Sequence, residues 1–225
     1  MAHDGAIALE LVESLSPSEV SEVRRIYEEG FPPHQRADFV ELIEQRQPGE
    51  FALALVRGRQ PCGFAMLRPL GDTDWAYLRY FVVDRSQRSR GLGGLFWDRL
   101  TARLRAAGFT LLVFDVEDPA EPGYEVDQSR LRSRRISFYQ RHGASLLPVR
   151  GFRAPHPAVD GPDSTPMLVM AAPLAGNSLA PNAGRTRAIV VAVYRYRWQL
   201  EPGHPLVAAI QVGDHAGLPW IHDAS

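Results

Sequence analysis

Cysteine is almost absent from this sequence, since Cys62 is the only one among 225 residues. A single thiol excludes an intrachain disulfide framework and a thiolate metal cluster, and it fits a reducing compartment. Cys62 follows Pro61 in an apolar stretch, where we expect a small buried side chain rather than a reactive nucleophile.

Long hydrophobic runs are missing as well. No apolar segment approaches the roughly twenty residues that span a bilayer. The segment 1–5 also lacks a basic stretch followed by an apolar one, as a secretory signal would have. We therefore expect a cytoplasmic protein that does not associate with membranes.

Neither sign of charge is in excess, because 25 basic residues stand against 26 acidic ones and the formal net charge is -1. This balance gives no overall field that would recruit nucleic acid, so any anion must be bound locally. The seven histidines are scattered without a pair at metal-ligand spacing, which predicts no metal site.

What the sequence does contain is an ordinary globular composition, 45% hydrophobic and 23% charged. Helical spacing of apolar residues begins at Ser16, where Pro17 and Glu19 complete a helix start with a capping box. Gly30 ends this pattern and suits a left-handed residue at the end of a helix. A second, shorter helix is predicted around 39–43.

Strand-like patterns dominate the middle of the chain. Strands are predicted over 6–12, 51–56, 62–68, 76–84 and 109–116. Three of them, at 51–56, 62–68 and 76–84, are separated by short glycine turns and predict an antiparallel meander. A helix over 95–104 then leads to the strand at 109–116, and such a helical connection predicts parallel neighbours.

The last part of the chain changes character after two more strands. A basic helix is predicted over 130–142, followed by strands at 144–149 and 165–171. A segment rich in Ala, Pro and Gly comes next and reads as a linker. In the following segment apolar residues recur at helical spacing, although aromatic residues alternate with arginines there as in a strand.

This organisation predicts one main domain over residues 1–172, a linker over 173–184 and a C-terminal extension over 185–225. We expect the extension to consist of one helix, over 187–200, and an irregular tail.

The segment from Arg88 to Gly94 joins a predicted strand to a predicted helix. Its glycines let the backbone approach a ligand closely, and the start of a helix offers unpaired amides, which together favour a phosphate group. Close packing of the glycines is the alternative. A dinucleotide fingerprint is excluded because Phe96 replaces its third glycine, and a nucleoside triphosphatase loop would need Gly-Lys-Ser/Thr.

Two motifs, in the expected order, resemble those of the GNAT superfamily of N-acyltransferases. The family signature Gln/Arg-x-x-Gly-x-Gly/Ala is matched by residues 88–93, which begin five positions after Val83. An aromatic residue followed by Tyr, shortly before a Gly, is matched by Phe138, Tyr139 and Gly143. The resemblance covers roughly residues 6–171.

This resemblance implies an α/β (α+β) fold, with a mixed, mostly antiparallel central sheet flanked by helices. It also implies acetyl-CoA as co-substrate, no metal, and direct transfer of the acetyl group to a primary amine on a small molecule or peptide. The residues that it assigns to coenzyme A are Val82, Val83, Arg88, Ser89, Arg90, Gly91, Leu92, Gly93 and Gly94.

The same resemblance implies that Tyr139 is the general acid that protonates the departing thiolate. Asp115 and Glu117 alternate on one face of a predicted strand, and they are the candidate general bases. Asp115 ranks first, since some relatives carry a carboxylate there. The alternative is that both carboxylates are solvated or pair with arginines of the next helix. Glu28 and Glu29 are weaker candidates at a solvated helix end.

Several alternatives stay open at this point. The stretch 118–133 is longer than in the family and lacks an Asn that often contacts the pantetheine arm. A longer acyl group, a hydroxyl acceptor, or a non-catalytic acyl-CoA-binding sensor or scaffold would fit the same motifs. The C-terminal extension contains Tyr194, Tyr196 and Trp198, which could dock on a partner or on a second copy of the chain, so it is a candidate surface for a homodimer.

Overall fold

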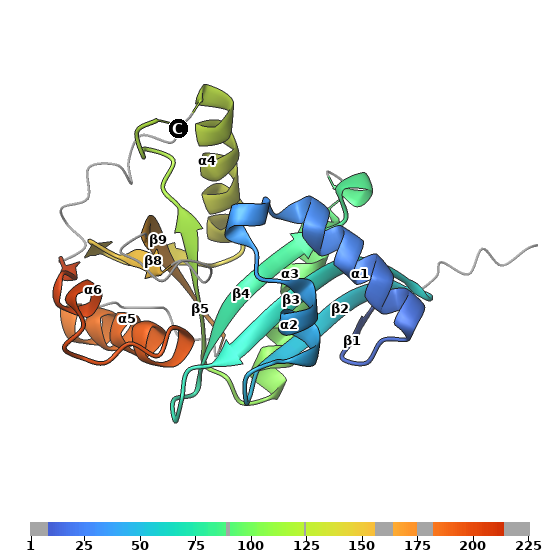
Figure 1. The fold of residues 1–225 in the computed structure, drawn as a ribbon, viewed down its shortest axis with the longest axis horizontal. Helices are drawn as coiled ribbons and strands as arrows, with labels where there is room; N and C mark the ends of the chain where they lie inside the picture. The colour runs from blue at the N-terminus through green and yellow to red at the C-terminus, as the bar shows by residue number, and fades with distance from the viewer. Residues whose placement is uncertain (1–8, 89–90, 124, 156–163, 175–181, 214–225) are drawn as a thin grey trace, which may run out of the picture. The chain divides into compact units, whose positions relative to one another are not determined.

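The computed structural model describes residues 9–88, 91–123, 125–155, 164–174 and 182–213 (Figure 1). The chain divides into two compact units. Unit 1 consists of residues 1–68 and 78–107, and unit 2 consists of residues 69–77 and 108–225. Each unit is described by itself below.

The described residues contain an eight-stranded sheet with the order β1-β2-β3-β4-β5-β9-β6, in which β8 pairs with β9. Its pairings β1–β2, β2–β3, β5–β9, β6–β9 and β8–β9 are antiparallel, and β4–β5 is parallel. The mixed, mostly antiparallel α/β architecture predicted from the sequence is therefore confirmed. The parallel pairing predicted for the strand at 109–116 is also confirmed, since β5 pairs in parallel with β4.

Unit 1 holds the first strands and three α-helices. Its elements are β1 (Leu9–Val12), α1 (Pro17–Gly30), a 3₁₀ turn η1 (Pro33–Gln35), α2 (Phe39–Glu44), β2 (Phe51–Arg57), most of β3 (Gln60–Pro69), the second part of β4 (Trp75–Val83), a 3₁₀ turn η2 (Arg85–Gln87) and α3 (Leu92–Ala106). The predicted capping box is present in α1, where the Ser16 backbone amide donates to the Glu19 carboxylate at 2.7 Å.

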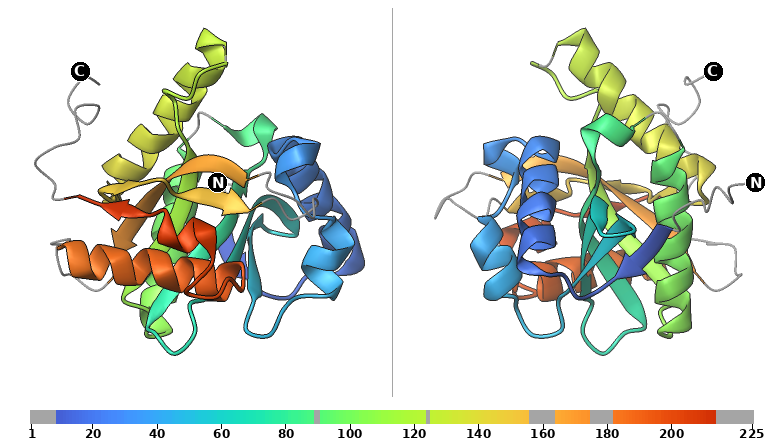
Figure 2. Two further views of the ribbon diagram at one scale, coloured as in Figure 1. Left: turned by 60° about the vertical axis from the view of Figure 1, so that its left-hand side comes forward. Right: turned by 90° about the vertical axis from the view of Figure 1, so that its right-hand side faces the viewer.

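Helices cover both faces of the sheet in unit 1 (Figure 2, right). Tyr80 and Val82 of β4 belong to a buried cluster with residues of α1 and α2. Phe81, between them, points the other way and stacks on Phe96 of α3, with ring centroids 4.7 Å apart. Because successive side chains of a strand alternate between faces, this one strand holds helices on both sides.

Gly30 has a different role from the one predicted. It lies inside α1 and is not among the glycines with positive φ, and α1 ends instead at the extended Phe31. A Cβ atom at Gly30 would overlap the Val82 side chain, so the glycine lets the end of α1 approach β4 closely.

Unit 2 is built around β5. Its elements are the first part of β4, β5 (Leu111–Glu117), α4 (Val126–Arg141), β6 (Ser145–Leu146), β7 (Val149–Arg150), β8 (Arg153–Pro155), β9 (Ser164–Pro173), α5 (Ala183–Arg197), α6 (Pro205–Ala208) and β10 (Gln211–Val212). Trp75–Tyr77 of β4 pairs with Leu111–Val113 of β5, and β9 pairs with the whole of β5 on its other side.

The helices α4 and α5 lie on opposite faces of the sheet in unit 2 (Figures 1 and 2). Phe114 of β5 contacts Tyr139 of α4, with ring centroids 4.5 Å apart. Val113, its neighbour, belongs instead to a buried cluster with Ile189 and Val193 of α5. Within the extension expected over 185–225, α5 thus packs on the sheet and its core residues are fully buried.

Candidate functional site

Asp84 follows β4 directly and is firmly held, four residues before the cofactor loop predicted over 88–94. Asp84 is only 5% exposed, and its carboxylate accepts from both the backbone amide and the hydroxyl of Ser86, each at 2.7 Å. Its own amide donates to the Cys62 carbonyl at 3.0 Å. These bonds fix the direction in which the chain leaves the strand and enters η2.

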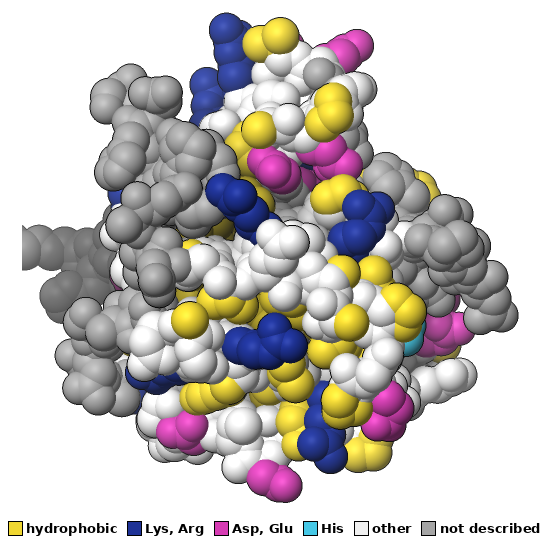
Figure 3. All heavy atoms as spheres, turned by 90° about the vertical axis from the view of Figure 1, so that its left-hand side faces the viewer, with side chains coloured by type: hydrophobic (Ala, Val, Ile, Leu, Met, Phe, Trp, Pro, Cys, Tyr) yellow, Lys and Arg dark blue, Asp and Glu magenta, His cyan; other side chains and the backbone are white. Residues whose placement is uncertain are grey.

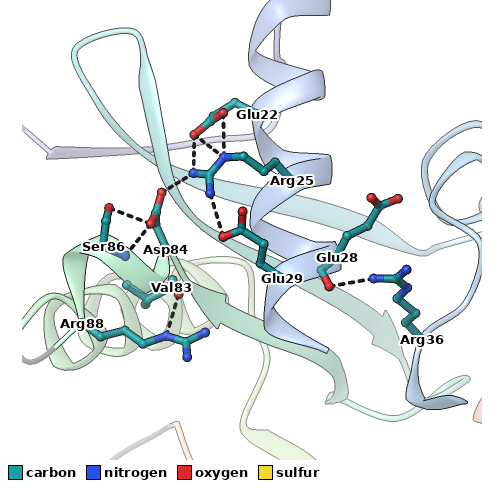
Figure 4. A network of polar contacts seen from close by, with 9 residues as sticks. All are labelled: Glu22, Arg25, Glu28, Glu29, Arg36, Val83, Asp84, Ser86 and Arg88. Carbon is teal, nitrogen blue, oxygen red and sulfur yellow. Dashed lines mark hydrogen bonds and ion pairs between the residues drawn. The ribbon is translucent and has the colours of Figure 1, made fainter. Parts of the chain in front are cut away.

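Arg25 of α1 completes the environment of Asp84 (Figure 4). Its guanidinium donates to Asp84 at 2.5 Å and also pairs with Glu22 and Glu29 of its own helix. Burial alone raises the pKa of Asp84, but the hydrogen bonds from Ser86 and Arg25 outweigh this effect and hold that pKa below its ordinary value. Sequence analysis missed Arg25, because 59 positions separate it from Asp84.

Gly91 begins α3 in a conformation that favours glycine. It is the N-cap residue with φ of 75°, and a Cβ atom placed there would have no heavy atom within 4 Å. Close packing therefore does not explain this glycine, whereas its left-handed backbone does. Among the described residues no side chain caps this helix start, and the first amides of α3 are a place where an anion can bind.

The other residues predicted to bind the cofactor are placed as follows. Val82 and Val83 end β4, while Leu92, Gly93 and Gly94 form the first turn of α3. The Arg88 side chain turns back toward β4, where its Nε donates to the Val83 carbonyl at 3.2 Å (Figure 4). Ser89 and Arg90 lie outside the described residues.

Tyr139, the predicted general acid, lies on the buried stripe of α4 with Arg132 and Ile136. The tyrosine is 7% exposed and packs against Phe114 of β5. Burial raises the pKa of Tyr139 to about 12, against a smaller opposing effect of the Arg135 charge. The hydroxyl is therefore protonated at neutral pH, as a proton donor must be.

Glu117, the second candidate base, is held by two arginines of α4. Its carboxylate accepts from Arg135 at 2.6 Å and from Arg132 at 3.2 Å. Arg132 is 5% exposed and also donates to the Asp118 carbonyl at 2.9 Å. Both bonds are charge-assisted, so Glu117 pairs with arginines of the next helix, which is one of the alternatives that the sequence left open.

Asp115, the first candidate base, has a different environment. The Tyr77 hydroxyl donates a hydrogen bond to its carboxylate. Burial raises the pKa of Asp115 above its ordinary value, and the bond from Tyr77 and the charge of Arg197 oppose this only in part. A carboxylate that binds its proton more tightly than usual is a better general base at neutral pH.

Asp115 and Tyr139 belong to opposite faces of the strand β5. Asp115 lies two residues after Val113, so the two share the face of β5 that packs with α5. Phe114, between them, points to the other face and contacts Tyr139 of α4. A reaction that uses both groups must therefore take place at an edge of β5 and not over one face.

The carboxylates at the end of α1 are paired within unit 1, and Figure 4 shows the pair formed by Glu29. Glu28 pairs with Arg24 at 2.8 Å, and Glu29 pairs with Arg25 at 2.8 Å. Both are partly exposed pairs on one helix, with 37% and 45% of the glutamate side chains accessible. Glu28 and Glu29 therefore lie at a solvated helix end, which was the preferred interpretation of their sequence position.

Cys62 is buried, as expected, and its thiol donates to the Leu55 carbonyl at 3.2 Å. Burial raises the pKa of the Cys62 thiol, which leaves it a poor nucleophile. In the part of the chain that the structure describes, no three His, Cys, Asp or Glu side chains are grouped to hold a metal ion. No helix among the described residues is long and apolar enough to cross a membrane.

Comparison with known proteins identifies the domain. The model of the acetyltransferase (GNAT) family matches residues 20–144. This range begins in α1, includes the loop after β4, and ends just after the Tyr139-bearing helix. No curated protein matches the chain.

Solved structures share the fold at low sequence identity. A GNAT-family protein from Bacteroides thetaiotaomicron is 23% identical, with a TM-score of 0.66, over 85% of this chain and 99% of that one. The ribosomal-protein-S18-alanine N-acetyltransferase from Escherichia coli is 19% identical, with a TM-score of 0.53, over 78% and 99%. An aminoglycoside 6'-N-acetyltransferase complexed with coenzyme A is 19% identical, with a TM-score of 0.57, over 78% of this chain and 99% of that one.

Proposed function

Because the chain belongs to the acetyltransferase (GNAT) family, by a match over residues 20–144, we propose that it transfers an acetyl group from acetyl-CoA directly to a primary amine. The observation that carries this proposal is the start of α3. A left-handed Gly91 with open space beside it precedes a helix whose first amides have no side-chain cap. Such a start fits a pyrophosphate group, which coenzyme A carries.

The cofactor would be bound by few side chains and many backbone groups. Amides of Leu92, Gly93 and Gly94 lie in the first turn of α3, where intrahelical partners are lacking. Arg88, four residues before Leu92, adds positive charge, although its Nε already donates a hydrogen bond to the Val83 carbonyl. The Arg25–Asp84 pair holds the chain at the point where this loop begins.

In the proposed reaction Asp115, on one face of β5, is the general base, and Tyr139, which packs on the other face, is the general acid. Asp115 takes a proton from the acceptor ammonium, and the neutral amine attacks the thioester carbonyl carbon. The new C–N bond forms and the C–S bond breaks, with the electron pair leaving on sulfur as a thiolate. Tyr139 gives its proton to that thiolate and is reprotonated by the extra N–H proton of the new amide, while Asp115 returns its proton to solvent. No covalent enzyme intermediate is needed. Glu117, already paired with Arg132 and Arg135, is not assigned the base.

A non-catalytic acyl-CoA-binding protein is the other candidate. Its cofactor loop would be the same, so the loop does not distinguish the two. The presence of both Tyr139 and Asp115 favours the enzyme, because a protonated phenol and a carboxylate are the two groups that the proton transfers need. A longer acyl group or a hydroxyl acceptor would use the same residues.

The test compares binding with turnover on the whole protein. Acetyl-CoA should raise the melting temperature, while pantetheine, which lacks the pyrophosphate, should raise it far less. Release of free CoA thiol should then depend on an added amine. The chain contains no lysine, so its own side-chain amines cannot consume acetyl-CoA. Binding without amine-dependent thiol release from any acceptor would favour the non-catalytic candidate, and equal shifts from both ligands would overturn the cofactor assignment.

A further inference from the structure

The Asp115 carboxylate belongs to a cluster of aromatic side chains in unit 2 that the proposed chemistry does not use. Tyr77, which donates to Asp115, lies edge-on to Trp198, with ring centroids 5.8 Å apart. Trp198 also contacts Phe152 and Tyr194, at 5.8 and 5.7 Å. One carboxylate is thus bordered by several rings, and Trp198 is only partly buried.

A positive charge belongs to the same cluster. The guanidinium of Arg197 lies 5.4 Å from the centre of the Trp198 ring. Its charge opposes the rise in the pKa of Asp115 that burial causes. Arg197 and Trp198 come from the end of α5, in the C-terminal extension, whereas Asp115 and Tyr77 come from the central strands. Opposite charges and aromatic rings therefore meet at one place on the sheet face that α5 covers.

The end of α5 is fixed to the rest of unit 2. A Cβ atom at Gly71, in the turn before β4, would overlap the Tyr196 ring, so this turn needs glycine to admit the ring. The Tyr194 hydroxyl donates to the Arg153 carbonyl and accepts from the Arg153 amide, both at 2.9 Å. The positions of Arg197 and Trp198 are consequently set by packing, not by a loose tail.

Resting on the acetyl transfer proposed above, we propose that the acceptor is an α-amino acid or a similar amine with an adjacent carboxylate. Its ammonium group pairs with Asp115, its carboxylate with Arg197, and its side chain contacts Tyr77 and Trp198. The C-terminal helix α5 is then the element that determines acceptor specificity.

The charges favour this class over a simple amine. A cation brought to Asp115 also meets the positive charge of Arg197, and the repulsion cancels part of the attraction. A zwitterion satisfies both groups at once. The guanidinium carries five N–H donors, so it can keep contacts within the protein and still hold a carboxylate. Figure 3 shows the side that carries α5 and α6, where hydrophobic side chains gather around basic ones.

Matched acceptor pairs test the proposal with the full-length protein. Each pair consists of an amino acid and the amine that lacks only its carboxylate: phenylalanine with phenethylamine, leucine with 3-methylbutylamine, and tryptophan with tryptamine. CoA thiol release at saturating acetyl-CoA gives kcat/KM for each compound. We expect at least one amino acid to exceed its amine by tenfold or more, the range of a charge-assisted contact.

Variants of α5 then link that preference to one side chain. Arg197→Gln should lower the ratio of kcat/KM between amino acid and amine by about tenfold to a hundredfold, and Arg197→Lys should lower it less. Arg195→Gln is the matched control, because Arg195 is exposed on the same helix and contacts Tyr196 instead. The melting temperature shift by acetyl-CoA verifies that each variant is folded.

The outcomes separate this proposal from the one on which it rests. Amines that equal or exceed their amino acids in every pair overturn the acceptor class while acetyl transfer stands. An Arg197→Gln protein that keeps the wild-type ratio also overturns it. If none of these compounds releases CoA thiol, the acceptor class is overturned, and the enzymatic function is then decided by the wider amine test described for the proposed function.

Discussion

The hydroxyl of Tyr77 in β4 donates a hydrogen bond to the carboxylate of Asp115 in β5, across 38 positions of the sequence. The bond stabilises the charged form of a carboxylate whose burial favours the neutral form. Besides the acceptor contact proposed above, Tyr77 thus acts through Asp115 and helps to set the pH at which that group can accept a proton.

Replacing Tyr77 should consequently move the pH profile of the reaction. In Tyr77→Phe the donor is gone, the pKa of Asp115 rises further, and the acid limb of log kcat/KM moves to higher pH by about one unit. Tyr80→Phe is the control, since the Tyr80 hydroxyl accepts from the Ala37 amide and lies in unit 1. An unchanged acid limb in Tyr77→Phe would show that Asp115 is not the base.

Gly91→Ala should weaken acetyl-CoA binding through the backbone. Its φ of 75° is costly for alanine, by about 1 kcal/mol. Gly108→Ala carries a similar penalty, because Gly108 has φ of 91° and open space, but it follows the other end of α3. Both variants should lose similar thermal stability, and only Gly91→Ala should raise the Kd for acetyl-CoA in a titration. Equal losses of affinity would exclude a specific role of the loop.

Arg25→Gln should destabilise the protein and loosen the cofactor loop. The change removes one partner of a nearly buried Asp84, at a cost of about 1 to 2 kcal/mol. Because the pKa of Asp84 is lowered in the folded state, this contribution is present at neutral pH and is lost as pH falls through that pKa.

The comparison for Arg25 is Arg24→Gln, on the same helix. Arg24 forms an ion pair with the partly exposed Glu28, four residues further on, and lies 6.0 Å from the centre of the Phe39 ring. Such an ion pair contributes less than about 0.5 kcal/mol. Urea unfolding and the KM for acetyl-CoA measure both effects. Equal behaviour of the two variants at neutral pH would show that the Arg25–Asp84 pair does not position the loop.

Tyr139→Phe should lower kcat by roughly ten- to a thousandfold and leave the Kd for acetyl-CoA nearly unchanged, because only a proton transfer is removed. With a pKa near 12, the wild-type hydroxyl stays protonated through the usual assay range, so it should add no basic limb below about pH 10. Full turnover by the variant would exclude Tyr139 from the mechanism.

Several features of this protein follow from short stretches of sequence. The capping box of Ser16 and Glu19, the glycine-rich turn before α3 and the helix that carries Tyr139 each depend on residues within a few helical turns. The left-handed conformation of Gly91 was not predicted, since the sequence suggested one at Gly30 instead. These local patterns were sufficient to predict the α/β fold, the loop after β4 and the family. Local rules succeed here because the interactions themselves are local.

The tertiary structure alone decided which side chains meet. Arg25 reaches Asp84 across 59 positions and Tyr77 reaches Asp115 across 38, and no spacing in the sequence signals either pair. Asp115 and Glu117 are two positions apart in one strand, and the sequence does not distinguish them. In the structure, Glu117 pairs with arginines of α4, whereas Asp115 interacts with Tyr77 and with the charge of Arg197. Strand register and helix packing fix these partners, since contacts between distant segments depend on the whole core and not on neighbouring residues.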